Sequence, residues 1–150
     1  MKNIFELEVS SEIIDRINLL TPATKSLWGK MNVSQMLAHC NVTYEMVYTE
    51  KHPKPNFVMK LILKTFVKKI VVGEKEYSKN GKTAPQFLIS DEREFEKEKK
   101  NLIDYIKKTQ KLGATYFDQK ESHSFGKLNK KEWNNMFYKH LDHHLSQFGV

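Results

Sequence analysis

The chain has 150 residues, of which 39% are hydrophobic and 29% are charged, so it is long enough to bury one core and does not have the composition of a disordered chain. No apolar run reaches the roughly 20 residues that a membrane-spanning helix needs, and the first residues are too acidic for a secretory signal. The only cysteine, Cys40, excludes an internal disulfide. We therefore expect a single domain over residues 1–150 in the reducing cytoplasm.

The net charge of +7 is concentrated in one segment. Residues 51–82 contain nine lysines and two glutamates, so the net charge of this segment equals that of the whole chain. A lysine-rich face is most simply a solvated surface that keeps a protein soluble. It is also what a protein uses to bind an anionic surface or partner, although nucleic acid is the partner we expect least.

Helical periodicity dominates the first half of the chain. A first helix is predicted to begin at a cap at Ser10 or Ser11 and to end at Thr21-Pro22, because the residue before proline avoids helical backbone angles. A second helix is predicted from Asn32, with Gln35 as its capping-box partner, to the Pro-containing segment 51–55.

The second half is predicted to hold three more helices. A basic helix is expected over about residues 57–72, ending at Gly73, and a long loop over residues 73–90. A further helix is expected from Ser90 or Asp91 to Gly113, followed by a polar loop over residues 114–128. The last helix is predicted from the cap Asn129, with Glu132 as its capping-box partner, to Gly149.

Each of the four main helices has one apolar face, and these faces must be buried against one another. The simplest arrangement is an all-α fold, a four-helix bundle with the basic helix inserted in its middle crossover. The apolar residues of that basic helix also indicate a covered surface, which a homodimer would provide.

The chemistry of the chain is concentrated in its last helix. His140 and His144 are four residues apart, so their imidazoles project from adjacent turns of one face, in the centre of an apolar stripe. Two imidazoles at this spacing can bind one metal ion. Alternatively, each ring finds a carbonyl or carboxylate partner in the core, because burying it without a hydrogen bond costs roughly 1–3 kcal/mol.

Other residues could complete or assist such a site. His39, on the flank of the second helix, is a candidate for a third ligand. Three histidines would leave a fourth coordination position open for water or substrate, as in catalytic metal sites. Cys40 points about 100° away from His39 and is interpreted as a small buried hydrophobic residue. His143 at the edge of the stripe, Tyr44 and Tyr48 are candidates for moving protons, and no pattern selects among them.

Two segments resemble a known family. Trp28-Gly-Lys-Met-Asn32 with Gln35-Met-Leu-Ala-His39-Cys40 resembles the second-helix signature of an uncharacterised branch of the DinB-like (YfiT-type) metalloenzyme superfamily. Residues 138–149, which contain both histidines, resemble the last helix of that branch, and residues 123–133 resemble the loop before it. Many members have Arg-Gly-Gln after the histidine pair, whereas this chain has Leu145-Ser146-Gln147.

The resemblance implies an up-down-down-up four-helix bundle and one divalent metal ion, often nickel or zinc. Its ligands, carried over to this chain, are His39, His140 and His144. Characterised relatives include thiol S-transferases and a thiol-dependent isomerase, so the resemblance also implies a low-molecular-weight thiol as cofactor and a small-molecule substrate.

Three functions therefore follow from the sequence. The first is a metal-dependent enzyme, such as a thiol S-transferase or a hydrolase. The second is a non-enzymatic bundle that binds a partner or an anionic surface through Lys60, Lys64 and Lys68. The third is a bundle in which the metal ion only stabilises the fold.

Overall fold

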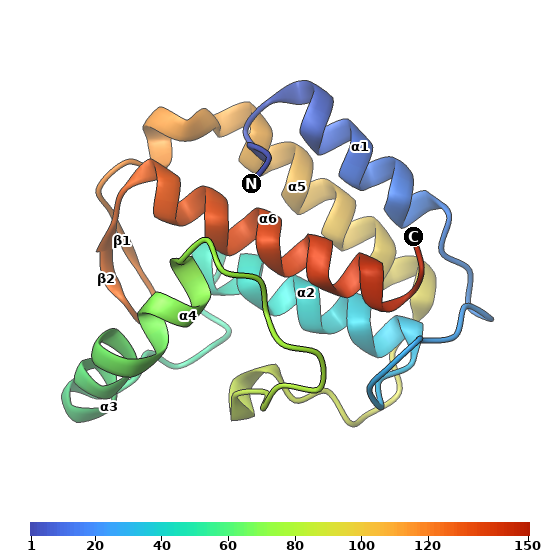
Figure 1. Ribbon diagram of the computed structural model, residues 1–150, viewed down its shortest axis with the longest axis horizontal. Coiled ribbons are helices and arrows are strands. Elements are labelled where there is room, and N and C mark those ends of the chain that lie inside the picture. The colour runs from blue at the N-terminus through green and yellow to red at the C-terminus, as the bar shows by residue number, and fades with distance from the viewer.

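Four long helices lie side by side in the computed structural model, which describes residues 1–150 (Figure 1). They are α1 (Leu7–Asn18), α2 (Val33–Tyr48), α5 (Phe95–Phe117) and α6 (Lys130–Gln147). Their shared core contains large side chains that are almost completely buried, including Tyr44, Phe117, Trp133 and Phe137. The expectation of a mainly helical fold is confirmed.

Shorter elements occupy the connections. The basic segment forms α3 (Phe57–Ile62), a π-helical turn η1 (Leu63–Val67) and α4 (Lys68–Val72), and η2 (Pro85–Phe87) is a single 3-10 turn. Strands β1 (Lys120–Ser122) and β2 (Gly126–Leu128) form an antiparallel hairpin before α6. None of these helices combines the length and the apolar character that crossing a membrane requires.

Local signals predicted the starts of α2 and α6 correctly. Asn32 accepts a hydrogen bond from the Gln35 amide at 2.8 Å, and Asn129 accepts one from the Glu132 amide at 2.9 Å. In both cases the side chain of the third residue also bonds to the amide of the cap, so both capping boxes are complete. The basic helix also covers the expected residues, with Asn56 as its cap.

The predicted start of the first helix was wrong. The helix α1 begins at Leu7, and Ser10 lies inside it with its hydroxyl donating to the Leu7 carbonyl at 3.0 Å. The cause is tertiary: Ile4 is completely buried, and its amide donates to Asn134 of α6 at 2.7 Å. The chain is therefore already anchored to the core when the helix begins.

The bounds of the third main helix were also predicted incorrectly. The helix α5 begins at Phe95 instead of Ser90 or Asp91, since Asp91 pairs with Arg93 in the loop before it. It resumes after Gly113, which has a φ of 73°, and continues to Phe117. Phe117 is fully buried and stacks on Phe5 with ring centroids 5.3 Å apart, so core burial favours this last turn.

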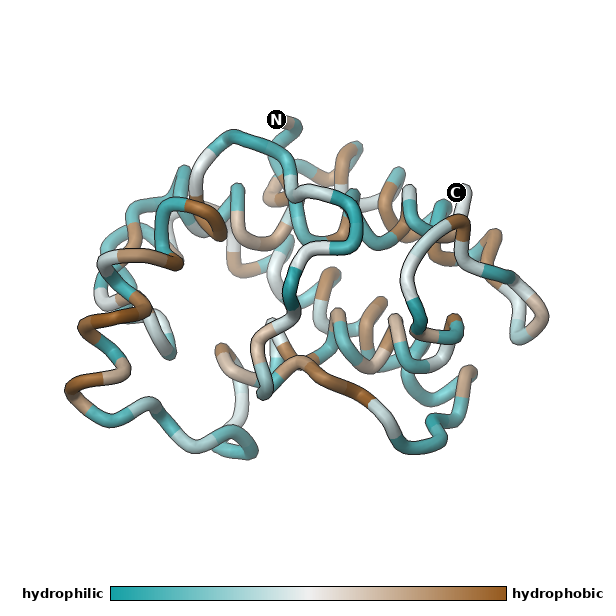
Figure 2. Tube along the Cα trace, turned by 60° about the horizontal axis from the view of Figure 1, so that its bottom comes forward, coloured by the Kyte–Doolittle hydropathy of each residue, from teal (hydrophilic) through white to brown (hydrophobic).

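The segment 114–128 is consequently not one polar loop. It holds the end of α5 and the hairpin, in which Ser122 pairs with Gly126. The segment 73–94 is irregular apart from η2, and it passes along the outside of the long helices (Figure 1). Figure 2 shows that hydrophobic and hydrophilic residues alternate along the helices, as expected when only one side of each helix meets the core.

Candidate metal centre

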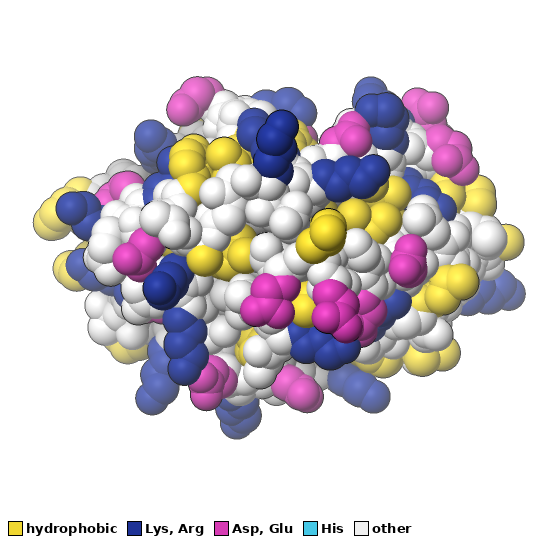
Figure 3. Space-filling model, turned by 90° about the horizontal axis from the view of Figure 1, so that it is seen from above, with side chains coloured by type: hydrophobic (Ala, Val, Ile, Leu, Met, Phe, Trp, Pro, Cys, Tyr) yellow, Lys and Arg dark blue, Asp and Glu magenta, His cyan; other side chains and the backbone are white.

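Three histidines from two helices meet in the interior. His39 comes from α2, and His140 and His144 come from successive turns of α6. One ring nitrogen from each lies within 4.8 Å of the other two. His39 and His144 are buried and His140 is half-buried, and no histidine is visible on the face of the molecule in Figure 3. The structure thus brings together the three residues predicted as ligands.

In His39 and His144, Nδ1 is the outer ring nitrogen, which points away from the cluster, and Nε2 is the inner one. Each outer nitrogen has a hydrogen-bond partner that fixes its protonation. Nδ1 of His39 lies 2.8 Å from the Phe87 carbonyl oxygen, which can only accept, so this nitrogen carries the proton. Nδ1 of His144 lies 2.8 Å from Oε1 of Gln147. The Gln147 amide is oriented by its own donation to the Trp28 carbonyl at 2.7 Å, so Nδ1 of His144 must also be the donor.

The inner nitrogens of these two rings are therefore unprotonated in the neutral state. A neutral imidazole with Nδ1–H has a lone pair on Nε2, which is the form that binds metal ions. Hydrogen bonding of the outer nitrogen to a carbonyl is the usual way in which a protein orients a metal-binding histidine. Both rings have this arrangement.

The two ring nitrogens of His140 contact His39 and Thr43. Its Nε2 lies 2.9 Å from Nε2 of His39, and its Nδ1 lies 3.1 Å from the Thr43 hydroxyl. Since Nε2 of His39 is an acceptor, the His140 ring donates from Nε2 and accepts from Thr43 when no cation is bound. The Thr43 hydroxyl can rotate and accept instead, which leaves a third lone pair on the inner side.

Burial keeps these rings neutral. Desolvation lowers the pKa of His39 and lowers that of His140 well below its usual range, and it lowers the pKa of His144 to about 3. The neighbouring histidines add to the shift, because a second positive charge in the cluster would be repelled. Neutral rings are what metal ligation requires.

Aromatic side chains surround the cluster. The Phe87 ring lies 5.4 Å from the His39 ring and 6.0 Å from the His140 ring, between ring centroids. The Tyr77 ring lies 6.4 Å from that of His140. Both residues come from the segment between α4 and α5, so the long crossover covers the site.

His143 is close to the cluster without belonging to it. Its half-buried ring lies 5.0 Å from the His144 ring, and it is flanked by Tyr77 at 5.5 Å and Trp28 at 6.0 Å. Burial lowers its pKa as well. The ammonium of Lys79 lies 4.4 Å above the Trp28 ring, which places one positive charge beside this group.

The remaining candidates from the sequence lie in the core. Cys40 is buried against Met36 with the sulfurs 3.8 Å apart, and burial raises the pKa of its thiol, so its interpretation as a hydrophobic residue is confirmed. Tyr44 stacks between Tyr105 and Phe137. The Tyr48 hydroxyl bonds to that of Thr109 at 2.7 Å. The tyrosine rings therefore pack among aromatic residues and not against the histidines.

Sequence reasoning missed the groups that orient the ligands. Gln147 follows His144 by three residues on the same helix, so spacing could have indicated it. Thr43 follows His39 by one turn in the same way. The Phe87 carbonyl could not have been found, because it comes from an irregular segment 48 residues away.

The backbone of Gly29 packs closely against the Gln147 side chain. Its φ of 84° lies in the left-handed region, and a Cβ atom here would overlap the Gln147 side-chain nitrogen. The Gln147 carbonyl also accepts from the Leu27 amide at 2.8 Å. The segment before α2 is thus held against the end of α6.

Comparison with known proteins places the chain in a family. DUF1569, described as a protein family of unknown function, matches residues 3–149. The chain belongs to the DUF1569 family. No curated protein and no solved structure matches it significantly. The matched range includes both histidine segments and the crossover between them.

Proposed function

We propose that this DUF1569 protein is a metal-dependent enzyme in which Nε2 of His39, His140 and His144 hold one divalent metal ion. The observation that carries the proposal is the orientation of the three rings. Two outer nitrogens donate to carbonyl oxygens, so their lone pairs face inward at a group of nitrogens within 4.8 Å. Such a set of neutral imidazoles fits zinc or nickel.

We further propose that the chain is a member of the DinB-like superfamily. The helix directions support this assignment, since α1 and α6 run one way and α2 and α5 the other (Figure 1). This order is the up-down-down-up bundle that the superfamily has. The positions of His39 on the second long helix and of His140 and His144 on the last one also agree with it.

The proposed reaction class is thiol S-transfer or hydrolysis on a small molecule. A divalent metal ion held by His39, His140 and His144 would act as a Lewis acid and would lower the pKa of a bound thiol or water. Phe87 and Tyr77 exclude bulk water from the ligands. His143 is placed to accept a proton, because its ring is half-buried next to His144. Lys79 would attract an anionic thiol or substrate.

Metal analysis tests the ligand set. The chain should be purified without a metal-affinity column, and its metal content measured by mass spectrometry. We expect about one zinc or nickel ion per chain, lost in a His140→Ala/His144→Ala variant. The His52→Ala variant is the matched control, since His52 pairs with Glu45 outside the cluster. Full metal occupancy in the double variant would rule out the site.

A second experiment separates catalysis from a stabilising role. The loaded protein should be assayed with a set of low-molecular-weight thiols and electrophilic substrates, and with hydrolase substrates. Turnover that is lost in a His143→Asn variant of normal metal content would support the proposed enzyme. A large gain in melting temperature on metal loading, without an exchangeable water or thiol on the metal, would favour a structural site.

A further inference from the structure

The basic arm, which we define as α3, η1 and α4 (residues 57–72), has apolar side chains that pack on the core and other apolar side chains that are exposed. Leu63, Val67, Val71 and the buried Val72 pack on the core. Seven large apolar residues of the arm are exposed to solvent: Phe57, Val58, Met59, Leu61, Ile62, Phe66 and Ile70. Phe57 is 83% exposed and Phe66 is 71% exposed.

Four of the exposed residues, Val58, Ile62, Phe66 and Ile70, recur every four residues and form one stripe. Phe57 and Leu61 lie nearer the hairpin, beside the lysines. Figure 2 shows hydrophobic residues along this arm, which projects at one end of the molecule in Figure 1. A helix whose apolar residues extend around most of its surface is normally buried. This stripe therefore requires an occupant.

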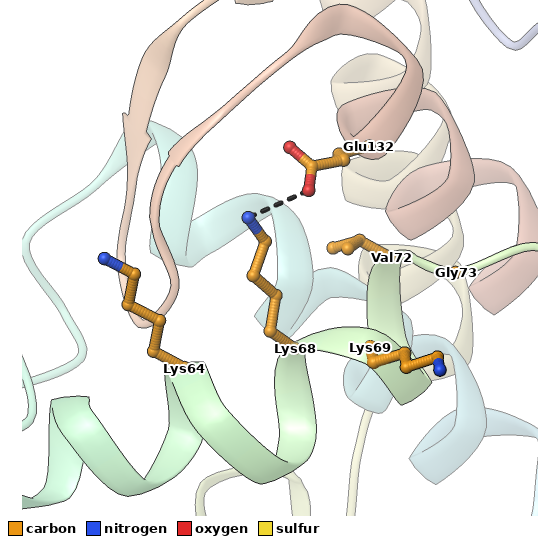
Figure 4. A pocket seen from close by; sticks show the side chains of 6 residues that line it. All are labelled: Lys64, Lys68, Lys69, Val72, Gly73 and Glu132. Carbon is orange, nitrogen blue, oxygen red and sulfur yellow. Dashed lines mark ion pairs between the residues drawn. The ribbon is translucent and has the colours of Figure 1, made fainter.

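A row of lysines runs along the side of the arm that faces the hairpin and α6. Lys60 and Lys68 pair with Glu121 and Glu132 at 2.8 Å each, which holds the arm to the body. Lys64 lies between them and forms no ion pair, and neither does Lys69. In Figure 4, Lys64 and Lys68 extend from the same side of the helix, and Lys69 points elsewhere.

Two hollows lie along this row of lysines. One, of about 310 Å³, is lined by Lys64, Lys68 and Lys69 together with Val72, Gly73 and Glu132 (Figure 4). The other, of about 520 Å³, lies between the arm and the hairpin, and is lined by Lys60, Lys64, Lys127, Glu121 and apolar residues of α3. Lys64 borders both hollows, so an anionic group could reach it from either side.

Charge and shape decide between the possible occupants. A second copy would bring the segment with the whole net charge of +7 against itself, which is repulsive. A groove on a partner protein would need to enclose the arm, but the core and the two ion pairs already occupy one side of it. A flat surface with an apolar interior and an anionic boundary satisfies both the stripe and the lysines.

We propose that the basic arm docks the protein onto an anionic lipid surface. Phe57, Phe66 and the other exposed apolar residues enter the boundary of the acyl region, and Lys64, Lys69 and Lys127 contact lipid phosphates or carboxylates. This inference does not depend on the metal centre. The side of the bundle formed by α1, which lies away from the arm in Figure 1, stays in water.

Vesicle co-sedimentation tests the proposal. The full-length protein is mixed with vesicles of phosphatidylcholine alone, or with vesicles that also contain phosphatidylserine. We expect binding only to the second kind, weakening as salt is raised. Phe57→Ser/Phe66→Ser and Lys64→Glu/Lys69→Glu should each lower the partition coefficient by at least about tenfold.

Matched controls use similar residues elsewhere. Leu7→Ser/Leu19→Ser replaces two leucines that are 68% exposed, at the start of α1 and directly after its end. Lys107→Glu/Lys111→Glu changes two exposed lysines of α5. Both should bind as the parent does. The substituted residues are all exposed, and circular dichroism of each variant should show the helical spectrum of the parent protein.

Three results would overturn the proposal. The first is the absence of binding to phosphatidylserine vesicles at low salt. The second is an equal loss of binding in the control variants, which would indicate a general effect of charge. The third is a dimer in light scattering that Phe57→Ser/Phe66→Ser dissociates, since the stripe would then be covered by a second copy.

Discussion

At the scale of single residues, the candidate metal centre depends on groups that do not bind the metal themselves. The Phe87 carbonyl and the Gln147 side chain each accept from the outer nitrogen of a histidine at 2.8 Å. Without them either nitrogen of His39 or His144 could carry the proton. These partners select the tautomer whose lone pair faces inward.

Replacing Gln147 by alanine should weaken metal binding. Nδ1 of His144 would lose its acceptor, and the Trp28 carbonyl would lose its donor, so the ring would no longer be held in one orientation. We expect the affinity for zinc, measured by competition with a chelating dye, to fall by about 10-fold to 100-fold.

Gln110→Ala on α5 serves as the control for this change, because Gln110 lies outside the cluster. Gln147→Glu keeps an acceptor for Nδ1 of His144 and should bind more tightly than Gln147→Ala. An unchanged affinity in Gln147→Ala would show that orientation of His144 does not depend on this contact.

At the scale of elements, one buried lysine joins the basic arm to the last helix. The Lys139 ammonium on α6 donates to the carbonyls of Ile70 at 2.8 Å, Gly73 at 2.6 Å and Lys75 at 3.1 Å. The Ile70 carbonyl lies in the last turn of α4, where a helix leaves acceptors unpaired, and the other two lie just after the helix. Asn135 adds a bond to the Val72 carbonyl at 2.9 Å.

We expect Lys139→Met to destabilise this junction. Three carbonyls would lose their donor in a mostly buried position, which should lower the free energy of unfolding by about 2–3 kcal/mol in denaturant titrations. Lys131→Met is the control, since its partner Glu74 is exposed and its loss should change stability by less than about 0.5 kcal/mol. Equal effects of the two substitutions would contradict this role.

At the scale of the whole molecule, the buried histidines link stability to pH. Their pKa values in the folded metal-free protein lie below the roughly 6.5 of an unfolded chain, chiefly because of burial. Below that pH the unfolded state binds more protons than the folded state, so folding is favoured less as the pH falls. Each histidine can contribute about 1.4 kcal/mol per pH unit in this window.

The metal-free protein should therefore lose stability between about pH 6.5 and pH 5. Urea titrations across this range measure the effect, and His140→Gln/His144→Gln should have a shallower dependence. Glu45 does not contribute to the change in stability over this range. Its pKa is lowered from 4.5, so its own effect on stability changes at more acidic pH. A stability that is constant over the histidine range would contradict the neutral state of the cluster.

The sequence by itself determined features that depend on neighbouring residues. The capping boxes at Asn32 and Asn129, the span of the basic arm and the common face of His140 and His144 follow from local spacing, and the structure has all of them. His39 was assigned as the third ligand through family resemblance, because its own helix placed it only on the flank.

The tertiary structure decided whatever depends on distant parts of the chain. Burial of Phe117 extends α5 beyond Gly113. Anchoring of Ile4 to the core lets α1 begin at Leu7, earlier in the chain than predicted. The approach of α2 to α6 brings His39 within reach of His140, and the crossover places the Phe87 carbonyl behind His39. Core packing, which no local pattern encodes, thus assembles the three histidines into one site.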